Sequence, residues 1–277
     1  MTVKIVTDST ADIPPSIAEA LDISTVPVYV RFGRQVYRDI IEISHDELYT
    51  KLADDPVHPT TSQPSPSDFA TVYRQLLQPG DEIVSIHVSS KLSGTYNAAL
   101  QGRELVEGSH IEVFDSGSLS MGLGLTVMAA ARLAKAGQGL AAVLAEVRAA
   151  ISQSRAFGLL DSLKYLAKGG RVGKAKALVG GLLNVKPLLV LKDGELHPSG
   201  LVRNRRRGLE RLFEYVKGAP SLREVAIVYS TAPDEAQALK ERLAAVIDKN
   251  RIYISQLWPA LGVHGGPGTL LVALKRK

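Results

Sequence analysis

The chain has 277 residues, 45% of them apolar and 22% charged, with a net charge of +5 and no cysteine. These proportions are those of an ordinary globular protein, which excludes a collagen-like, disordered or disulfide-stapled chain, as well as thiolate metal sites and cysteine nucleophiles. A core of this size tends to split, so we expect two domains. Residues 1–10 lack the apolar run of a signal peptide or membrane span, so we expect a cytoplasmic protein without a membrane span.

The first half of the chain alternates short β-branched runs with helical patterns, which predicts a mostly parallel sheet with helical crossovers. The predicted strands are residues 3–6, 25–30, 82–88 and 111–114. Helix starts are marked by side chains that can accept hydrogen bonds from free backbone N–H groups. These are Asp12 before Pro14 and Pro15, Ser44 before Glu47, and Ser65 before Pro66.

Two hairpins are predicted next. Residues 29–37 favour a β-hairpin, and two alanine- and leucine-rich helices, 119–136 and 140–152, favour a helical hairpin. The second half begins with a clear β-hairpin over 186–202, because Asp193-Gly194 supplies the positive φ angles of a two-residue turn. Helices at 205–217 and 233–248 and strands at 225–230, 252–257 and 269–274 follow.

We therefore expect two packed domains. Residues 1–153 form an α/β domain with a mostly parallel sheet, and residues 154–277 form an α+β domain with an antiparallel sheet. Polar clusters follow three predicted strands, at 7–10, 89–95 and 115–117. Ligands of open parallel sheets bind at the carboxyl ends of strands, so we expect these clusters to face one crevice.

Ser93 and Gly94 open a predicted helix that runs through residues 96–105. A hydroxyl beside free helix N–H groups can hold a carboxylate or phosphate, although the alternative is that each serine only caps a helix. Residues 59–66 predict a stiff loop with hydroxyls between prolines. Residues 259–269 place His264 among four glycines and two prolines, in a turn that lets backbone approach a ligand closely. His264 is therefore either a functional group or a brace of that turn.

Positive charge is concentrated in residues 162–211, which carry twelve basic and three acidic side chains, a net charge of +9. Such a region attracts phosphate, nucleic acid or the acidic face of a protein, unless it is only a solvated surface. No metal site or cofactor is indicated, since the six histidines lie far apart and residues 169–174 lack the Walker spacing. A serine hydrolase would use Ser93 as nucleophile and His264 as base, but no residue is indicated as the third member of a catalytic triad.

Seven segments along the whole chain, in order, resemble motifs of the DegV family, which includes the FakB-type carrier subunit of bacterial fatty-acid kinase. They are VTDSTAD at 6–12, TSQPS at 61–65, SSKLSGTY at 89–96, DS at 115–116, LKYLAKGGRVG at 163–173, KP at 186–187 and PALGVHGGPG at 259–268. The resemblance implies a two-domain fold that encloses one long-chain fatty acid, without a cofactor. It also implies a carrier that is not itself an enzyme and that works with a kinase partner.

Site residues follow from the same motifs. The resemblance implies that Thr61, Ser62, Ser93 and Gly94 bind the fatty-acid carboxyl and that His264 is its neighbour in phosphoryl transfer. It implies that Arg203 meets the kinase partner, and we assign Arg171 and Arg205 of the same basic region to that surface.

Three functions stay open. The first is a carrier that presents its fatty acid to a kinase for acyl-phosphate formation. The second is an acyl hydrolase that uses Ser93 and His264, and the third is a nucleic-acid-binding regulator that uses the basic region. An aliphatic composition suits an acyl tunnel, and a carboxylate at its mouth needs hydroxyl or N–H donors. Residues 162–211 contain a single aromatic residue, Tyr165, which counts against binding of single-stranded nucleic acid by base stacking. We therefore expect the carrier, with no nucleic-acid partner and only transient contact with a membrane surface.

Overall fold

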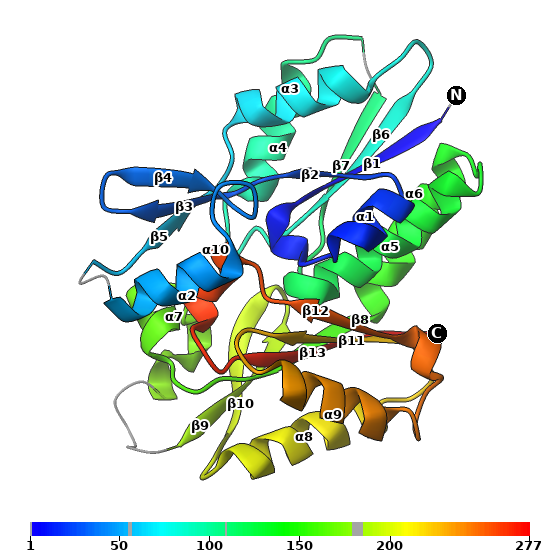
Figure 1. Cartoon of the computed structure of the whole chain (residues 1–277). Helices are drawn as coiled ribbons and strands as arrows, with labels where there is room; N and C mark the ends of the chain where they lie inside the picture. The colour runs from blue at the N-terminus through cyan, green and yellow to red at the C-terminus, as the bar shows by residue number, and fades with distance from the viewer. Residues whose placement is uncertain (1, 55–56, 109, 179–184) are drawn as a thin grey trace.

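A parallel sheet organises the first half of the chain. The structure, a computed structural model, describes residues 2–54, 57–108, 110–178 and 185–277 (Figure 1). Strands β1 (Val3–Asp8), β2 (Ile23–Val26), β6 (Glu82–His87) and β7 (His110–Asp115) pair in the order β2-β1-β6-β7, all parallel. This confirms the predicted sheet.

Helices cover both faces of this sheet. Helices α3 (Pro66–Leu76) and α4 (Thr95–Glu104) lie on one face, and α1 (Pro15–Ala20), α5 (Ser120–Lys135) and α6 (Leu140–Gln153) lie on the other (Figure 1). Neighbouring strand residues divide between the two faces as strand geometry requires, with Val6 packed in the α3–α4 core and Ile5 in the α5–α6 core. The predicted helical hairpin at 119–152 is confirmed.

A six-stranded sheet organises the second half. It contains β8 (Ser154–Leu159), β9 (Lys186–Lys192), β10 (Glu195–Val202), β11 (Leu222–Tyr229), β12 (Ile252–Gln256) and β13 (Leu270–Arg276), in the order β10-β9-β8-β13-β11-β12. All neighbours are antiparallel except β11 and β12. Asp193 and Gly194 take φ angles of 51° and 77°, so the predicted turn between β9 and β10 is confirmed.

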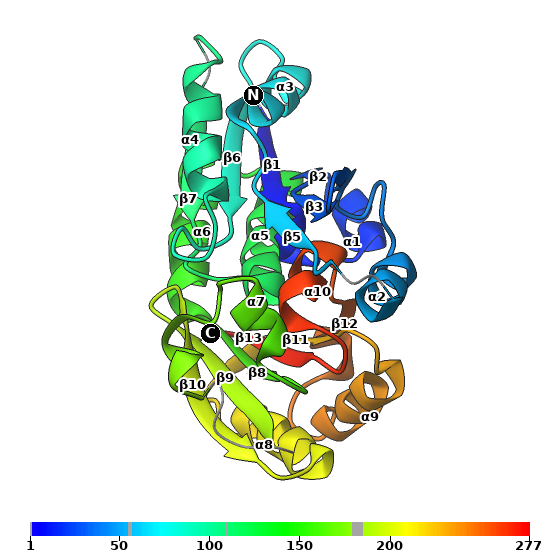
Figure 2. The ribbon, with the colours of Figure 1, turned by 90° about the vertical axis from the view of Figure 1, so that its left-hand side faces the viewer.

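Helix α5 joins the two halves, which are stacked in the view of Figure 2. Helices α8 (Arg205–Lys217) and α9 (Pro233–Leu243) cover one face of the six-stranded sheet, and α5 packs between its other face and the parallel sheet. Residues 120–131 are all buried, because small residues such as Gly122 and Gly124 let neighbouring backbone and side chains approach. The division of the chain after residue 153 stays a prediction.

A third group of elements lies between the halves. Strands β3 (Tyr29–Phe32), β4 (Gln35–Arg38) and β5 (Thr60–Ser62) form a small antiparallel sheet, and α2 (His45–Asp54), α7 (Lys164–Lys168) and α10 (Pro259–Gly265) lie near it. Short 3-10 turns at Ser9–Ala11, Gly173–Leu178 and Lys249–Arg251 complete the described elements.

Four predictions of local structure need correction. The strand predicted at 25–30 is divided between β2 and β3, since Pro27 lacks the N–H group that a continuous ladder needs. The helix predicted from residue 233 ends at Leu243 instead of residue 248. The loop at 59–66 contains β5, and the glycine-rich turn at 259–269 contains α10. Strand β8 was not predicted, because its alanine and glycine weaken the β signal.

Candidate functional site

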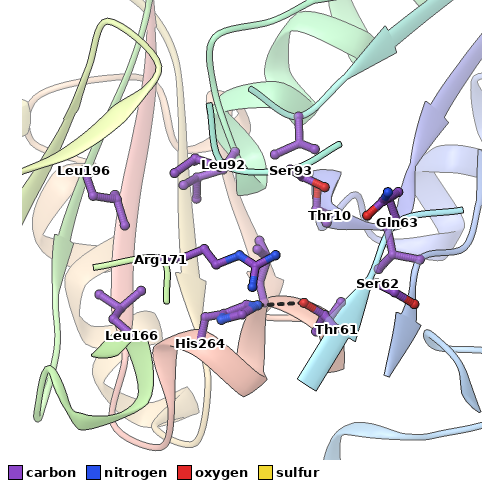
Figure 3. A pocket seen from close by; sticks show the side chains of 15 residues that line it. Thr10, Thr61, Ser62, Gln63, Leu92, Ser93, Leu166, Arg171, Leu196 and His264 are labelled. Atoms are coloured by element: carbon purple, nitrogen blue, oxygen red, sulfur yellow. Dashed lines mark hydrogen bonds between the residues drawn. The ribbon is translucent and has the colours of Figure 1, made fainter. Parts of the chain in front are cut away.

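A polar pocket lies where β5, α10 and the loop before α4 meet (Figure 3). Its apolar wall includes Val28, Val88 and Leu92. Its polar lining comes from both halves of the chain and consists of Thr10, Thr61, Ser62, Gln63, Ser93, Arg171 and His264. Three of the four residues predicted to bind a carboxyl group are therefore brought together with His264.

Helix α10 carries His264 in its last turn, with the side chain almost fully buried. His264 Nε2 lies 2.8 Å from Thr61 Oγ1, and His264 Nδ1 has no hydrogen-bond partner among the described residues. Burial lowers the pKa of His264 to about 4, and the nearby charge of Arg171 acts in the same direction. The imidazole is therefore neutral at physiological pH.

Two buried aspartates from the first half hold the start of α10. Asp12 Oδ1 accepts a hydrogen bond of 2.9 Å from Trp258 N, and Asp39 Oδ1 accepts one of 3.0 Å from Ala260 N. Asp12, expected to start the helix at Pro14 and Pro15, does not cap it. Burial raises the pKa of Asp12 well above its usual range and that of Asp39 to about 7. The position of His264 thus depends on residues more than 200 positions away.

The three polar clusters that follow the strands do not all line the same space. Ser93 lines the polar pocket, where its Oγ lies 2.8 Å from Thr95 Oγ1. Thr10 also lines it and donates its hydroxyl proton to Asp8 over 2.5 Å. The cluster at 115–117 does not face this pocket, because Ser116 and Gly117 line a separate hollow beside the β9–β10 turn. The prediction that all three clusters share one crevice is therefore wrong.

Strand alternation separates the residues of β5. Thr61 points toward His264, whereas the hydroxyl of Ser62 points away from it (Figure 3). Gly94 lines a neighbouring polar depression, which we call the outer hollow, and not the polar pocket. Gln63 lines both spaces and was not among the predicted site residues. Gln63 follows β5 directly but lies outside the strand, so strand alternation alone does not predict its place.

The three arginines assigned to partner binding lie in different environments. Arg171 extends over the polar pocket beside His264 (Figure 3), and its Nη1 donates to Gly169 O. Arg203 is exposed and has no ion pair among the described residues. Arg205 is held by Glu235 at 2.5 Å and by Asp161 at 3.1 Å, so its charge is already neutralised within the chain.

An apolar cavity adjoins the polar pocket. The two spaces share five lining residues, which are Leu119, Leu166, Leu196, Leu261 and His264. Beyond them the cavity is lined mainly by aliphatic residues of β8, β9 and β13, together with Phe157 and Leu257, and its polar side chains are His264 and Thr269. Together the two spaces have a polar mouth and an aliphatic interior, which fits an amphipathic molecule with a long apolar tail.

A second histidine network resembles a catalytic triad but is closed off. His87 Nδ1 lies 3.0 Å from Asp8 Oδ2, and His87 Nε2 lies 2.7 Å from Ser85 Oγ. All three side chains are fully buried and none lines the polar pocket, so no substrate can reach the serine.

Within the described ranges no group of three or more acidic or histidine side chains is arranged to hold a metal ion. In the same part of the chain no helix is both long and apolar enough to cross a membrane.

Comparison with known proteins gives one consistent result. The model of the DegV family, described as uncharacterised proteins, matches residues 2–277. A DegV domain-containing protein of Deinococcus radiodurans is 36% identical over 279 residues, which cover 99% of each chain. The solved structure of a fatty-acid-binding DegV family protein from Thermus thermophilus superposes with a TM-score of 0.93 at 35% identity over the whole of both chains. A stearic-acid-binding protein from Eubacterium ventriosum gives 0.89 at 28% identity, over 99% of this chain and 98% of that one.

Proposed function

This chain belongs to the DegV family, and we propose that it binds one long-chain fatty acid between its two halves and presents it to a kinase partner. The observation that carries the proposal is the junction of the polar pocket with the apolar cavity around His264. The relatives from Thermus thermophilus and Eubacterium ventriosum support it, since both are fatty-acid-binding proteins and cover nearly the whole chain.

The carboxylate binds in the polar pocket, where donors replace the water that it loses. Because His264 Nδ1 has no partner, the neutral imidazole carries its proton on Nε2 and donates it to Thr61 Oγ1. The hydroxyl proton of Thr61 is then free for a carboxylate oxygen. Ser93 supplies a second hydroxyl, and Arg171 supplies a positive charge at the open side.

Acyl-phosphate formation needs a phosphoryl donor that the partner supplies. One carboxylate oxygen attacks the terminal phosphorus of a nucleoside triphosphate held by the kinase, and the nucleoside diphosphate leaves. Two anions approach each other in this step, so a hydrogen-bond donor and a positive charge beside the oxygen stabilise the charge that builds up. We assign the positive charge to Arg171 and the donor to the Thr61 hydroxyl, which His264 orients through Nε2.

The hydrolase alternative has less support. His264 Nε2 pairs with Thr61, and Ser93 Oγ pairs with Thr95, so the two residues form no nucleophile–base pair. His264 Nδ1 faces Gly169, whose added Cβ would lie 2.2 Å away, and no carboxylate among the described residues orients it. The geometry therefore supports a carrier and not a serine nucleophile.

Extraction of the purified protein with organic solvent, followed by mass spectrometry, tests the proposal. We expect one long-chain fatty acid per chain. A variant with Leu261→Asp and Leu196→Asp, two residues that line both spaces, should lose it while a circular dichroism spectrum confirms the fold. Native protein that carries no lipid and binds none on addition contradicts the proposal.

A further inference from the structure

Gln63 separates two spaces on the protein. Its side chain lines the polar pocket on one side and the outer hollow on the other, and Ser62 is the other residue common to both. The Gln63 amide makes no hydrogen bond within the described chain, and the residue is exposed. A polar side chain at a boundary, without a fixed partner, is free to turn toward either space.

Gly94 lies close to the amide group of Gln63. Gly94 has φ −75° and ψ 2°, a conformation open to every amino acid, so its backbone does not require glycine. An added Cβ would, however, lie 3.0 Å from Gln63 Nε2 and 3.1 Å from Cδ, so even alanine would move the amide by a few tenths of an ångström. A branched side chain at position 94 would need more of this space and would displace the Gln63 amide from the boundary.

The outer hollow is polar and carries an uncommitted cation. Its lining includes the exposed side chains of Arg31, Asn97 and Gln101, and Arg31 has no ion pair among the described residues. The one acid that lines it, Asp68, already accepts from Ser65 N at 2.8 Å and from the Tyr29 hydroxyl at 3.0 Å. Such a lining suits the approach of a phosphate group from outside.

Resting on the proposed function, we propose that the Gln63 amide closes the polar pocket toward the outer hollow. In the closed position its N–H donates to the bound carboxylate. When it turns aside, it opens the side from which the phosphoryl donor reaches that carboxylate. Gly94 leaves the space in which the closed amide rests.

The test uses the full chain loaded with oleate labelled with carbon-13 at the carboxyl carbon, and three measurements. These are the rate at which oleate leaves for albumin, the pH midpoint of the carboxyl resonance, and its broadening by a soluble gadolinium chelate. In Gln63→Ala, loss of one donor should raise the dissociation rate about tenfold and move the midpoint up by roughly one pH unit. Broadening should increase severalfold, since the pocket is then open to the outer hollow.

Three further variants separate donation from closure. Gln63→Leu should raise the midpoint but leave the broadening low, because its side chain fills the boundary without donating. Gly94→Val, whose branched side chain displaces the amide, should behave as Gln63→Ala does and add nothing in the double variant. Gln101→Ala, the same side chain in the outer hollow but outside the polar pocket, should match the native protein.

Gln63→Ala and Gln63→Leu with native values in all three measurements would overturn the inference, and fatty-acid binding would stand. Additive effects of Gly94→Val and Gln63→Ala would also overturn it. A native protein that takes up no labelled oleate overturns the proposed function, and the inference with it.

Discussion

Thr61 Oγ1 lies 2.8 Å from His264 Nε2, although 203 positions separate the two residues. The contact joins a strand of the small sheet to the last turn of α10, and it fixes the direction of a hydroxyl in the polar pocket. Asp39 and Asp12 extend the same connection to the start of α10. The mouth of the site is therefore assembled by contacts between segments from the two ends of the chain.

Removal of the two hydroxyls should weaken fatty-acid binding. The double variant Thr61→Val, Ser93→Ala loses one or two hydrogen bonds to a charged group, each roughly 1.5 to 3 kcal/mol. Affinity for oleate, measured by calorimetry, should fall more than tenfold. Thr60→Val is the control, since Thr60 is the exposed neighbour of Thr61 on β5 and lies outside the pocket lining. Unchanged affinity in a folded double variant would show that the carboxyl group binds elsewhere.

Replacement of His264 should affect phosphoryl transfer more than binding. His264→Ala keeps the hydroxyls of Thr61 and Ser93, so oleate affinity should stay within a few-fold of native. Partner-dependent acyl-phosphate formation should fall on the order of a hundredfold, because the Thr61 hydroxyl is no longer held by His264 Nε2 and loses its direction toward the reacting oxygen. Single-turnover assays and lipid titration on the same sample measure both. If binding, transfer and melting temperature all decline together, His264 serves only to brace α10.

Sequence reasoning predicted the sheets well because their signals are local. The Asp193-Gly194 turn and the strand at residues 3–6 follow from neighbouring residues alone. The resemblance to the DegV family is confirmed over residues 2–277. The role of Asp12 could not be predicted, because its partner, Trp258 N, lies 246 positions away. Helix α10 could not be predicted either, since the four glycines and two prolines of residues 259–269 are locally typical of a turn.

Among the site residues, too, some features follow from local motifs and others depend on contacts between distant segments. The motifs that contain Thr61 and Ser93 were identified, but the sides of β5 on which the Thr61 and Ser62 hydroxyls lie are fixed by pairing of β5 with β3. That pairing, absent from the local sequence, turns the Ser62 hydroxyl away from His264. The carboxyl-binding role of Thr61, Ser62, Ser93 and Gly94 stays a prediction until it is measured.

Charge reversal at Arg203 should slow association with the kinase partner without changing lipid binding. Arg203 is exposed and has no ion pair among the described residues, so Arg203→Glu alters only the long-range electrostatic field of the protein. Raising the salt concentration should slow the native protein in the same way, because exposed charges are screened. Surface plasmon resonance at two salt concentrations measures this. An association rate equal to native at low salt would make residues 162–211 a solvated surface only.

Arg205 should give a different result from Arg203. Its guanidinium is held by Glu235 and Asp161 and also donates to Gly268 O, so Arg205→Glu places three acids together near the start of α8. We expect a lower melting temperature for this variant, whereas Arg203→Glu melts as the native protein does. Thermal denaturation by circular dichroism compares them. Equal melting temperatures would mean that the ion pairs around Arg205 contribute no stability. Arg205 would then again be a candidate for partner binding.

The carboxyl group of Asp39 should lower the stability of the fold as pH rises from 5 to 8, while His264, whose pKa is lowered to about 4, acts in the opposite direction. Burial raises its pKa to about 7 in the folded chain, above the ordinary value of 3.8, so the folded state binds more protons than the unfolded state between those values. This contribution is complete below about pH 4 and is lost as pH rises through about 7. The loss between pH 5 and 8 amounts to about 2 to 3 kcal/mol for Asp39 alone. Urea denaturation should show that, on going from pH 5 to pH 8, Asp39→Asn gains stability relative to the native protein, and an equal pH dependence in both proteins would contradict the assignment.

The length of the acyl chain should depend on Gly158. This glycine of β8 lines the apolar cavity opposite Leu271 of β13, and an added Cβ would lie 2.5 Å from Leu271 Cδ2. Gly158→Val therefore fills part of the cavity and pushes Leu271 inward. Binding of 18-carbon acids should fall tenfold or more, while 12-carbon acids, which need less of the cavity, should bind nearly as before.

A second substitution should restore the long chains. Leu271→Ala removes the side chain that the valine displaces, so the double variant Gly158→Val, Leu271→Ala should bind 18-carbon acids more tightly than Gly158→Val alone. Because the two residues are in contact, their effects on affinity should not add. Competition assays with saturated acids of 12 to 18 carbons measure the length profile for all three variants. A uniform loss of affinity at every length would indicate a distorted sheet instead of a shortened cavity, and an unchanged profile would place the acyl chain elsewhere in the protein.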